Sequence, residues 1–407
     1  MTSKVSLRRS LGLPQMVLYG LGTTIGAGIY ALVGELAGIS GYMAPAAFLF
    51  ASLMAALTAL SFAELSSRFP QAAGASLYIK QGLGSSRLAL LAGLLVALAG
   101  IVSSAALINA FTDYLGQYFI LNRFTAILII ALCIGCLAAW GIVESVFIAA
   151  LITLIEIAGL ILIIVYSYPV LNEIPARLPE LLPSSDFHSW HLIFAGALLG
   201  FYAFIGFEDM VDVAEEVKDA RRNLPLAIII TLSITTILYM LIMTAAVLAI
   251  PPAQLALEKA PLVALYHHFS QDQSIIIGVI GMFAIINGAL IQTIMASRVL
   301  YGLSSRGHIH SSLSQVHHVT RTPLIATLLV GSLIFTFAIF GKLATLAETT
   351  SMIMLVIFSL INLSLLRIKM RESHTTEGIF SIPFWLPVVG FFVSSGFVLS
   401  QVINVLW

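Results

Sequence analysis

Long runs of hydrophobic residues alternate with short polar connections along the whole chain. Windows of about 20 apolar residues, the length of an α-helix that crosses a bilayer, mark eleven segments. The predicted spans are residues 13–38, 42–64, 88–119, 124–140, 142–168, 190–211, 224–249, 274–303, 323–340, 345–366 and 384–406. The longest connections have about twenty residues, too few for a soluble domain. We therefore expect an all-α, polytopic membrane protein with one transmembrane domain over residues 1–407.

The composition agrees with this prediction. Hydrophobic residues make up 59% of the chain and charged residues 9%, whereas soluble domains contain about 25% charged residues. The formal net charge of +0 argues against nucleic-acid binding, because phosphate recognition needs a basic face. The basic N-terminal residues resemble the start of a signal peptide, but the apolar run from Leu13 exceeds the roughly 7–15 residues of a signal peptide's apolar region. We take that run as the first span.

The distribution of basic residues predicts the orientation. With a cytoplasmic N-terminus, 15 of the 19 Lys and Arg residues fall on the inner side, which is the bias expected for multi-pass proteins. The four on the outer side are Arg123, Arg177, Lys259 and Lys342. Because eleven spans is an odd number, we expect Trp407 on the outside. The expected location is the cell membrane, which is the cytoplasmic or inner membrane if the source is bacterial.

Two spans carry glycine-rich interruptions at corresponding positions. Residues 22–30 read GTTIGAGIY in the first span, and Gly200 and Gly206 bracket FYAFI in the sixth. Glycines in membrane helices commonly allow close helix packing, which is the simpler interpretation of one such stretch. Two stretches in matching positions favour broken helices in inverted repeats, a mark of secondary transporters. The predicted repeats are residues 13–168 and 190–366, with residues 384–406 as an extra helix.

A helix broken at mid-membrane exposes N–H groups on one half and carbonyl groups on the other. N–H groups of residues 25–28 are expected to hold a carboxylate, as helix N-termini do. Carbonyls of residues 21–24 and 202–205 are expected to accept hydrogen bonds from an ammonium group. A zwitterion satisfies both sets of groups. An α-amino acid is the simplest abundant molecule of this kind, so it is the candidate substrate.

Several motifs follow in a characteristic order over nearly the whole chain: GTTIGAGIYALVGELAG, SFAELSSRFPQAAGASLYIKQ, GFYAFIGFEDMVDVAEEVKDARRNLP and NGALIQTIMASRVLYGLSSRG. Together they resemble the amino acid-polyamine-organocation superfamily of permeases, especially its bacterial amino acid permeases and its cationic amino acid transporter branch. The resemblance implies a five-plus-five inverted-repeat fold with broken first and sixth helices, and transport by alternating access. This chain differs from most members of the superfamily in having eleven predicted spans rather than twelve.

The resemblance also implies where the substrate binds. The carboxylate would lie at Gly26, Ala27 and Gly28, and the amine near residues of the first and sixth spans, with two phenylalanines beside the site. The full set of candidate substrate-binding residues is Thr23, Thr24, Ile25, Gly26, Ala27, Gly28, Tyr202, Ala203, Phe204, Ile205 and Phe207.

Two carboxylates inside the membrane are candidates for coupling or gating. Glu156 lies near the middle of the fifth span, where many relatives place a lysine that takes part in proton coupling, so the relatives' coupling does not transfer to this chain. An ionised carboxylate at that depth costs at least about 2.5–3.5 kcal/mol, which favours a functional group over a protonated acid bonded to a neighbouring helix. Glu208 follows the second interruption and has the same two interpretations. Asp209 and Asp212 are expected to pair with Arg or Lys.

The leading function is a secondary amino acid permease that works by proton-coupled symport or by amino acid exchange. A polyamine or other organic-amine transporter of the same fold is the alternative, and an ion channel is more remote. No GxxxxGK[ST], HExxH or GxSxG motif occurs, which disfavours an ATP-driven pump and an enzyme. We expect no cofactor and no metal site, because Cys133 and Cys136 are the two cysteines of the chain and cannot complete one.

Overall fold

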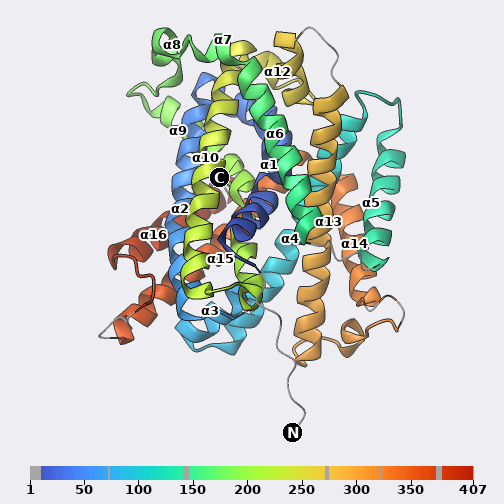
Figure 1. The fold of residues 1–407 in the computed structure, drawn as a ribbon, viewed down its shortest axis with the longest axis vertical. Coiled ribbons are helices and arrows are strands. Elements are labelled where there is room, and N and C mark those ends of the chain that lie inside the picture. The colour runs from blue at the N-terminus through green and yellow to red at the C-terminus, as the bar shows by residue number, and fades with distance from the viewer. Residues whose placement is uncertain are drawn as a thin grey trace.

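The structure is a computed structural model that describes residues 11–71, 74–140, 146–270, 275–318, 320, 322–372 and 378–406. Within these residues it is helical, and the one β-type pairing is an isolated bridge between Leu11 and Val217. Most of the long helices run side by side along the long axis of the molecule (Figure 1). The predicted all-α fold is confirmed.

Each of the eleven predicted spans corresponds to a helix. The first five are α1 (Leu13–Ser40), α2 (Ala44–Arg68), α4 (Ser86–Leu115), α5 (Arg123–Trp140) and α6 (Val146–Tyr166). The next five are α9 (Phe187–Phe201) with its continuations η2 (Tyr202–Phe204) and η3 (Phe207–Glu216), α10 (Ala220–Ala249), α13 (Ile275–Ser305), α14 (Leu324–Phe340) and α15 (Leu343–Arg371). The eleventh is α16 (Trp385–Leu406). Short helices occupy the connections: η1 (Gly41–Met43), α3 (Gly74–Leu83), α7 (Tyr168–Leu171), α8 (Ile174–Leu181), α11 (Pro252–Leu255), α12 (Pro261–Ser270) and η4 (Ser311–Ser314).

The long helices are apolar on all sides, as membrane helices are. Among the described residues, eight segments are long and apolar enough to cross a membrane, and two further apolar helices are shorter. One of the eight, Gly28–Arg68, joins the part of α1 from Gly28 onward to α2. In α4 the most apolar window is 72% buried, against 28% in α5 and 17% in α16. Helix α4 is therefore central, while α5 and α16 lie at the rim and expose apolar faces suited to lipid.

Helices at the same position in the two predicted repeats pack against each other. Helix α2 packs on α10, α4 on α13 and α5 on α14, while α1 contacts α9 and η2. This pairing is what two inverted repeats related by an axis in the membrane plane would produce. The division of the chain at residues 13–168 and 190–366 stays a prediction that this pairing favours.

The predicted interruption of the first span is wrong for this structure. Helix α1 runs without a break from Leu13 to Ser40. Its glycines serve close packing instead: a Cβ at Gly22 would overlap the Thr153 hydroxyl of α6, and one at Gly28 would lie 2.5 Å from the Cα of Ala203. The simpler interpretation of glycine, close approach between helices, therefore holds for α1.

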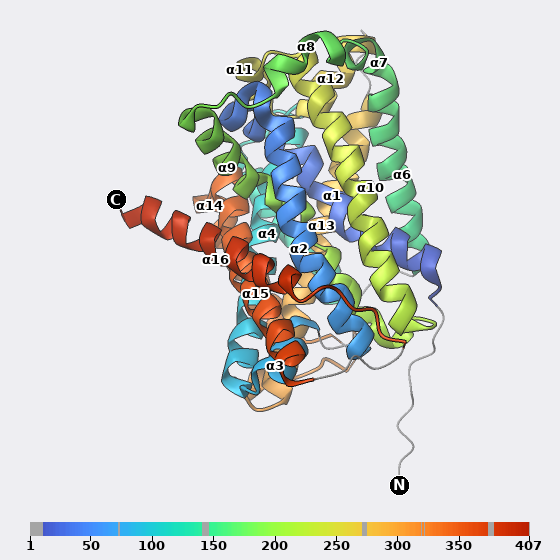
Figure 2. The same ribbon diagram turned by 90° about the vertical axis from the view of Figure 1, so that its left-hand side faces the viewer.

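A buried ion cluster holds α16 to the bundle. The Glu64 carboxylate of α2 has no exposed surface and accepts hydrogen bonds from Arg68 Nη2 (2.7 Å), Lys369 Nζ (2.8 Å) and the Ile382 N–H (2.8 Å). Lys369 belongs to α15 and Ile382 to the segment before α16, so one carboxylate joins three parts of the chain. From this anchor α16 crosses the long helices obliquely (Figure 2).

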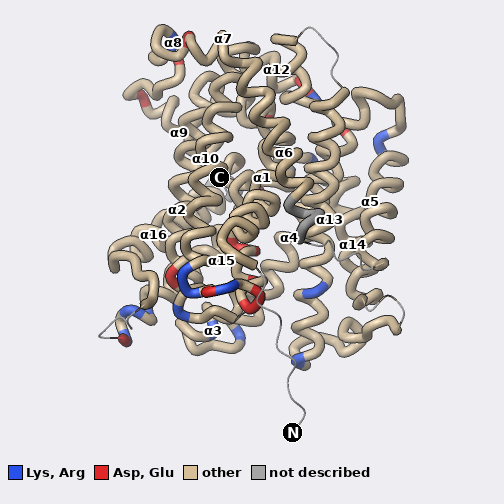
Figure 3. Tube along the Cα trace, viewed as in Figure 1, with Lys and Arg blue, Asp and Glu red and all other residues tan. Residues whose placement is uncertain are grey.

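Charged residues gather at the ends of the bundle, and basic residues are concentrated at the end that carries α3 (Figure 3). At the opposite end, Arg177 of α8 donates to the Leu248 carbonyl of α10 (2.9 Å) and pairs with Glu180 (2.8 Å). The hydrogen bond from Arg177 lowers the pKa of the Glu180 carboxyl below its ordinary value. The charge distribution favours the predicted orientation, with α3 on the cytoplasmic side.

Candidate substrate-binding site

The sixth span is broken, as the sequence predicts. Helix α9 ends at Phe201, one turn of 3-10 helix follows, and Ile205 is extended (φ −64°, ψ 135°). Gly206 then adopts φ 126°, ψ −22°, a conformation that side chains other than glycine rarely take, before η3 begins. The glycine of this motif thus lets the chain change direction at mid-bundle.

The break rests against the middle of α1. A Cβ on Gly206 would overlap the carbonyl oxygen of Thr23, so the two backbones are in direct contact. The Thr23 hydroxyl lies 3.0 Å from the Gly20 carbonyl of its own helix and 2.9 Å from the Gly206 carbonyl, and donates to them. The two predicted interruptions therefore meet in space, although only the second is a break in its helix.

Tyr239 of α10 joins both segments. Its hydroxyl oxygen lies 2.9 Å from the Thr24 carbonyl of α1 and 3.1 Å from the Ala203 carbonyl of η2, and it donates to them. Two backbone acceptors from corresponding places in the chain thus converge on one donor. An ammonium group at this point would find the same two acceptors, which are among the carbonyls that the sequence predicted.

A small cavity of about 30 Å³ lies beside this junction, and we call it the clamp cavity. Its lining combines the middle of α1, the break and the facing sides of α4 and α13. The lining residues are Gly22, Thr23, Thr24, Gly28, Ser103, Leu107, Tyr202, Ile205, Gly288, Ile291 and Gln292. Within it, the Tyr202 hydroxyl lies 2.9 Å from Ser103 Oγ, and the Thr24 hydroxyl is 3% exposed and has no hydrogen-bond partner among the described residues.

Five predicted substrate-binding residues line the clamp cavity: Thr23, Thr24, Gly28, Tyr202 and Ile205. Ala203 contributes its carbonyl to Tyr239, as described above. Ile25 and Gly26 are buried in α1 without lining the cavity, and the side chain of Ala27 lies outside the described residues.

Phe204 and Phe207 were predicted to lie beside the substrate, but both pack away from the cavity. Phe204 contacts Tyr239, with ring centroids 5.2 Å apart, and Phe207 packs between Phe62 (5.9 Å) and Phe358 (5.5 Å). Both rings are buried and are absent from the lining. In this structure the two rings hold the break in position through packing on the side that faces away from the clamp cavity.

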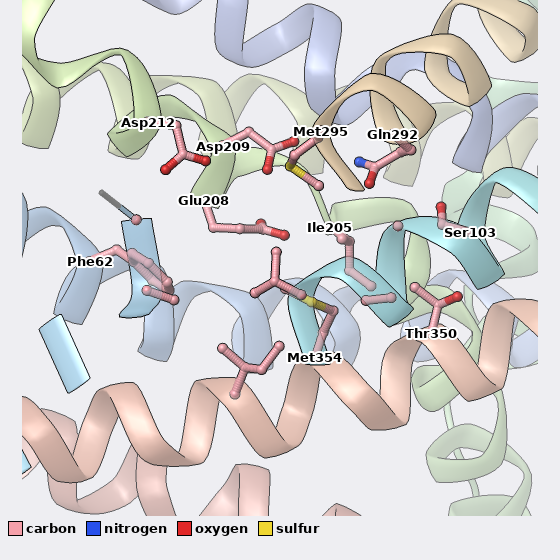
Figure 4. Close-up of a pocket in the computed structure, with 16 residues that line it drawn as sticks. Phe62, Ser103, Ile205, Glu208, Asp209, Asp212, Gln292, Met295, Thr350 and Met354 are labelled. Atoms are coloured by element: carbon pink, nitrogen blue, oxygen red, sulfur yellow. The ribbon is translucent and has the colours of Figure 1, made fainter. Parts of the chain in front are cut away.

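A second cavity of about 40 Å³ lies on the α3 side of the break, and we call it the acid cavity. It is lined by Glu208, Asp209 and Asp212 of η3 and by residues of α2, α3, α4, α13 and α15. Figure 4 shows the Glu208 carboxylate pointing into the space among these elements. Ser103, Ile205 and Gln292 line both cavities, so the two adjoin.

The two predicted coupling residues occupy different surroundings. Glu208 is half-buried in the acid cavity, and its Oε2 accepts a hydrogen bond of 2.9 Å from the Gly206 N–H at the break. Glu156 is 1% exposed on α6 and lines neither cavity. Its backbone carbonyl accepts from the Tyr30 hydroxyl of α1 (2.9 Å), which places it behind α1.

The prediction that Asp209 and Asp212 pair with Arg or Lys is wrong within the described residues, where the ion pairs include neither of them. The sequence does not predict Tyr239 or Gln292 as site residues. Both lie in long apolar helices, and the sequence does not show which of the few polar side chains of such a helix faces the break. For Asp209 the sequence does contain a signal, because this residue follows Gly206 closely and therefore lies at nearly the same depth in the bundle as the break.

These features define a class of protein. The protein is a multi-pass helical membrane protein in which one helix is broken at mid-bundle. Unsatisfied or displaceable polar groups surround closed cavities at that break. This is the architecture of a secondary transporter. Residues 11–406 match the model of a protein family described as amino acid permease. The chain belongs to this family, and the predicted resemblance is confirmed.

Individual relatives agree with the family. The chain is 29% identical over 386 residues to cationic amino acid transporter 4, vacuolar, of Arabidopsis thaliana, covering 89% of this chain and 64% of that protein. Identity is 29% over 385 residues with cationic amino acid transporter 3, mitochondrial, of the same plant, covering 89% and 63%. It is 28% over 377 residues with branched-chain amino acid permease BcaP of Bacillus subtilis, covering 86% and 77%.

The chain thus spans less than two thirds of the length of the two plant relatives. The names of all three describe transporters or permeases, which confirms that the chain falls outside the enzymes. The names differ in the type of amino acid, so they leave the substrate of this chain open.

Proposed function

We propose that this protein is a secondary transporter that moves an amino acid across the cell membrane by alternating access. The observation that carries the proposal is the convergence of the Thr24 and Ala203 carbonyls on one donor beside the clamp cavity. These acceptors suit the α-ammonium group of an amino acid. The names of the relatives, which describe transport of cationic and of branched-chain amino acids, support the same substrate class.

The described state is closed to substrate. Ligand pockets usually have volumes of about 300–1,000 Å³, far above the 30 Å³ of the clamp cavity. In addition, the continuous helix α1 uses the N–H groups of residues 25–28 for its own i to i−4 hydrogen bonds. We infer that substrate binding opens α1 at Gly26 and Gly28, so that these N–H groups meet the carboxylate.

The energy of this opening is modest. Each intrahelical hydrogen bond contributes about 0.5–1.5 kcal/mol net, and a carboxylate that accepts from the same N–H groups replaces it with a charge-assisted bond of about 1.5–3 kcal/mol. Glycine weakens a helix by about 1 kcal/mol relative to alanine, which lowers the barrier at this point. Closing and opening of α1 would then be coupled to the presence of substrate.

The proposed driving force is a proton gradient or exchange of one amino acid for another. Glu156 and Glu208 are the proposed coupling groups. Glu208 accepts from the Gly206 N–H at the break, and the backbone carbonyl of Glu156 accepts from Tyr30 of α1. A polyamine or other organic-amine substrate is the second candidate, favoured by the carboxylates of the acid cavity. The two adjoining cavities are small and separate, which does not favour a channel.

Purified protein in liposomes tests the proposal. We expect saturable, stereoselective uptake of labelled amino acids from a panel of neutral, acidic and basic members, with a rate that depends on an imposed proton gradient or on amino acid inside the vesicle. Empty liposomes are the control. Ion conductance that does not saturate, with no amino acid uptake under either condition, would contradict the proposal.

A further inference from the structure

The acid cavity contains more carboxyl groups than the proposed transport cycle uses. Glu208 stabilises the break, because its carboxylate accepts a hydrogen bond from the Gly206 N–H. The proposed transport cycle gives Asp209 and Asp212 no such role. Asp209 is 6% exposed and its Oδ2 has no hydrogen-bond partner within the described part of the chain. Asp212 is exposed at the α3 end of the cavity, where its Oδ1 lies against Gly74.

Within the described residues, the lining of this cavity includes three carboxyl groups and no Lys, Arg or His. A buried carboxylate without a partner is strongly unfavourable unless it is protonated or meets a cation. The lining also includes the apolar residues Met295, Met354 and Ile357. The site is therefore suited to a positively charged group with an apolar stem.

The arrangement fits an organic cation better than a metal ion. In the described residues no group of three or more His, Cys, Asp or Glu side chains is placed to hold a metal. The carboxylates are instead distributed along η3, from Asp209 at the buried end to Asp212 at the exposed end. An ammonium group has three donors and a guanidinium five, so either can be shared among acceptors that are spaced in this way.

The acid cavity also lies next to the clamp cavity, so one substrate molecule can reach both. Ser103, Ile205 and Gln292 belong to both linings, so a molecule anchored at the Thr24 and Ala203 carbonyls extends past Ile205 toward Asp209. The four-carbon stem of a lysine side chain is apolar and flexible, as this passage requires. Figure 4 shows Ile205 and Gln292 beside the same space as the carboxylates.

We propose that Asp209 and Asp212 form a subsite for the positively charged end of the substrate's side chain, an ammonium or a guanidinium group. The proposal rests on the proposed amino acid transport and adds the substrate class. Asp209 contacts the charged group once the substrate is bound, and Asp212 attracts it at the mouth of the cavity and receives it as the substrate leaves toward the α3 end.

Lysine and norleucine provide a sharp test, because they differ only in the terminal ammonium group. In proteoliposomes, wild-type protein should take up labelled L-lysine with a lower KM than L-norleucine. Asp209→Asn removes the charge without changing the size of the side chain. Loss of one charge-assisted hydrogen bond corresponds to about a tenfold rise in the KM for lysine. The KM for norleucine should stay within about twofold, since its side chain makes no such bond.

Glu215→Gln is the matched control, since Glu215 is an exposed carboxylate of η3 that lies outside both linings. It should leave both KM values unchanged. If Asp209→Asn does not fold, Asp212→Asn at the exposed end provides the second variant, with a smaller change in the same direction. Wild-type protein also gives an independent result: lysine should inhibit norleucine uptake more strongly than unlabelled norleucine does.

Three outcomes would overturn the subsite. Equal rises in both KM values would mean that Asp209 acts on transport itself, as a proton carrier or a structural group. Unchanged lysine KM in both variants would mean that the carboxylates do not meet the substrate. Preference of the wild type for norleucine would exclude a cation subsite while leaving amino acid transport intact. Absence of uptake for every amino acid would instead contradict the proposed function.

Discussion

Replacing Gly206 with alanine tests whether the break in the sixth span holds the two halves of the molecule together. Gly206 has φ 126°, which costs a non-glycine residue about 1–3 kcal/mol. The added Cβ would also overlap the Thr23 carbonyl, so α1 and η3 must separate. Separation weakens the hydrogen bond of 2.9 Å from the Thr23 hydroxyl to the Gly206 carbonyl, which contributes about 1 kcal/mol.

These effects act together and give a loss of at least about 2–4 kcal/mol in the stability of the described state. The assay is thermal unfolding of the purified protein in detergent, followed by intrinsic tryptophan fluorescence, alongside uptake in liposomes. We expect a clearly lower unfolding temperature for Gly206→Ala and a loss of most uptake activity. The strain and the overlap lie at one residue, so relaxation elsewhere in the bundle relieves little of it.

Gly302→Ala is the matched control. Gly302 lies in α13, and a Cβ there would meet no other atom within 4 Å. Alanine favours a helix over glycine by about 1 kcal/mol, so this variant should unfold at the same or a higher temperature. An unfolding temperature of Gly206→Ala equal to that of the wild type, together with normal uptake, would refute the interpretation of Gly206 as the point on which the break depends.

Three further variants test other parts of the molecule. Glu64→Gln leaves the buried Lys369 without its carboxylate partner, while Arg68 keeps its pair with Glu372. We expect about 3–5 kcal/mol of destabilisation, visible as a lower unfolding temperature, and an unchanged temperature would mean that the cluster is solvated. Tyr239→Phe removes the donor of two carbonyls and should destabilise by about 1–3 kcal/mol in the same assay, whereas no change would show that water replaces the hydroxyl. Glu156→Gln should remove the dependence of uptake on the proton gradient, and an unaltered pH profile would assign Glu156 a structural role.

The sequence predicts the eleven long apolar helices and most of their ends, because a membrane helix needs a fixed length of apolar residues whatever it contacts. It also predicts the break at Gly206, where a glycine, an aromatic run and acidic residues coincide. It does not predict the short helices in the connections. It fails at residues 22–30, since glycine permits a break and close packing equally, and only the neighbouring Thr153 and Ala203 decide between them. The orientation of Phe204 and Phe207 fails for a related reason, because helix rotation depends on contacts that no single sequence contains.

The difference between the two glycine-rich segments bears on the mechanism. If the substrate's ammonium group meets the carbonyls of Thr24 and Ala203, half of its binding site already exists in the closed state. The other half, the N–H groups of α1, exists only after the helix opens. A ligand shifts a conformational equilibrium only by its difference in affinity for the two states. The carboxylate is the group with that difference, so an amine that lacks a carboxylate should leave α1 unopened, and should be neither transported nor a strong inhibitor of amino acid uptake.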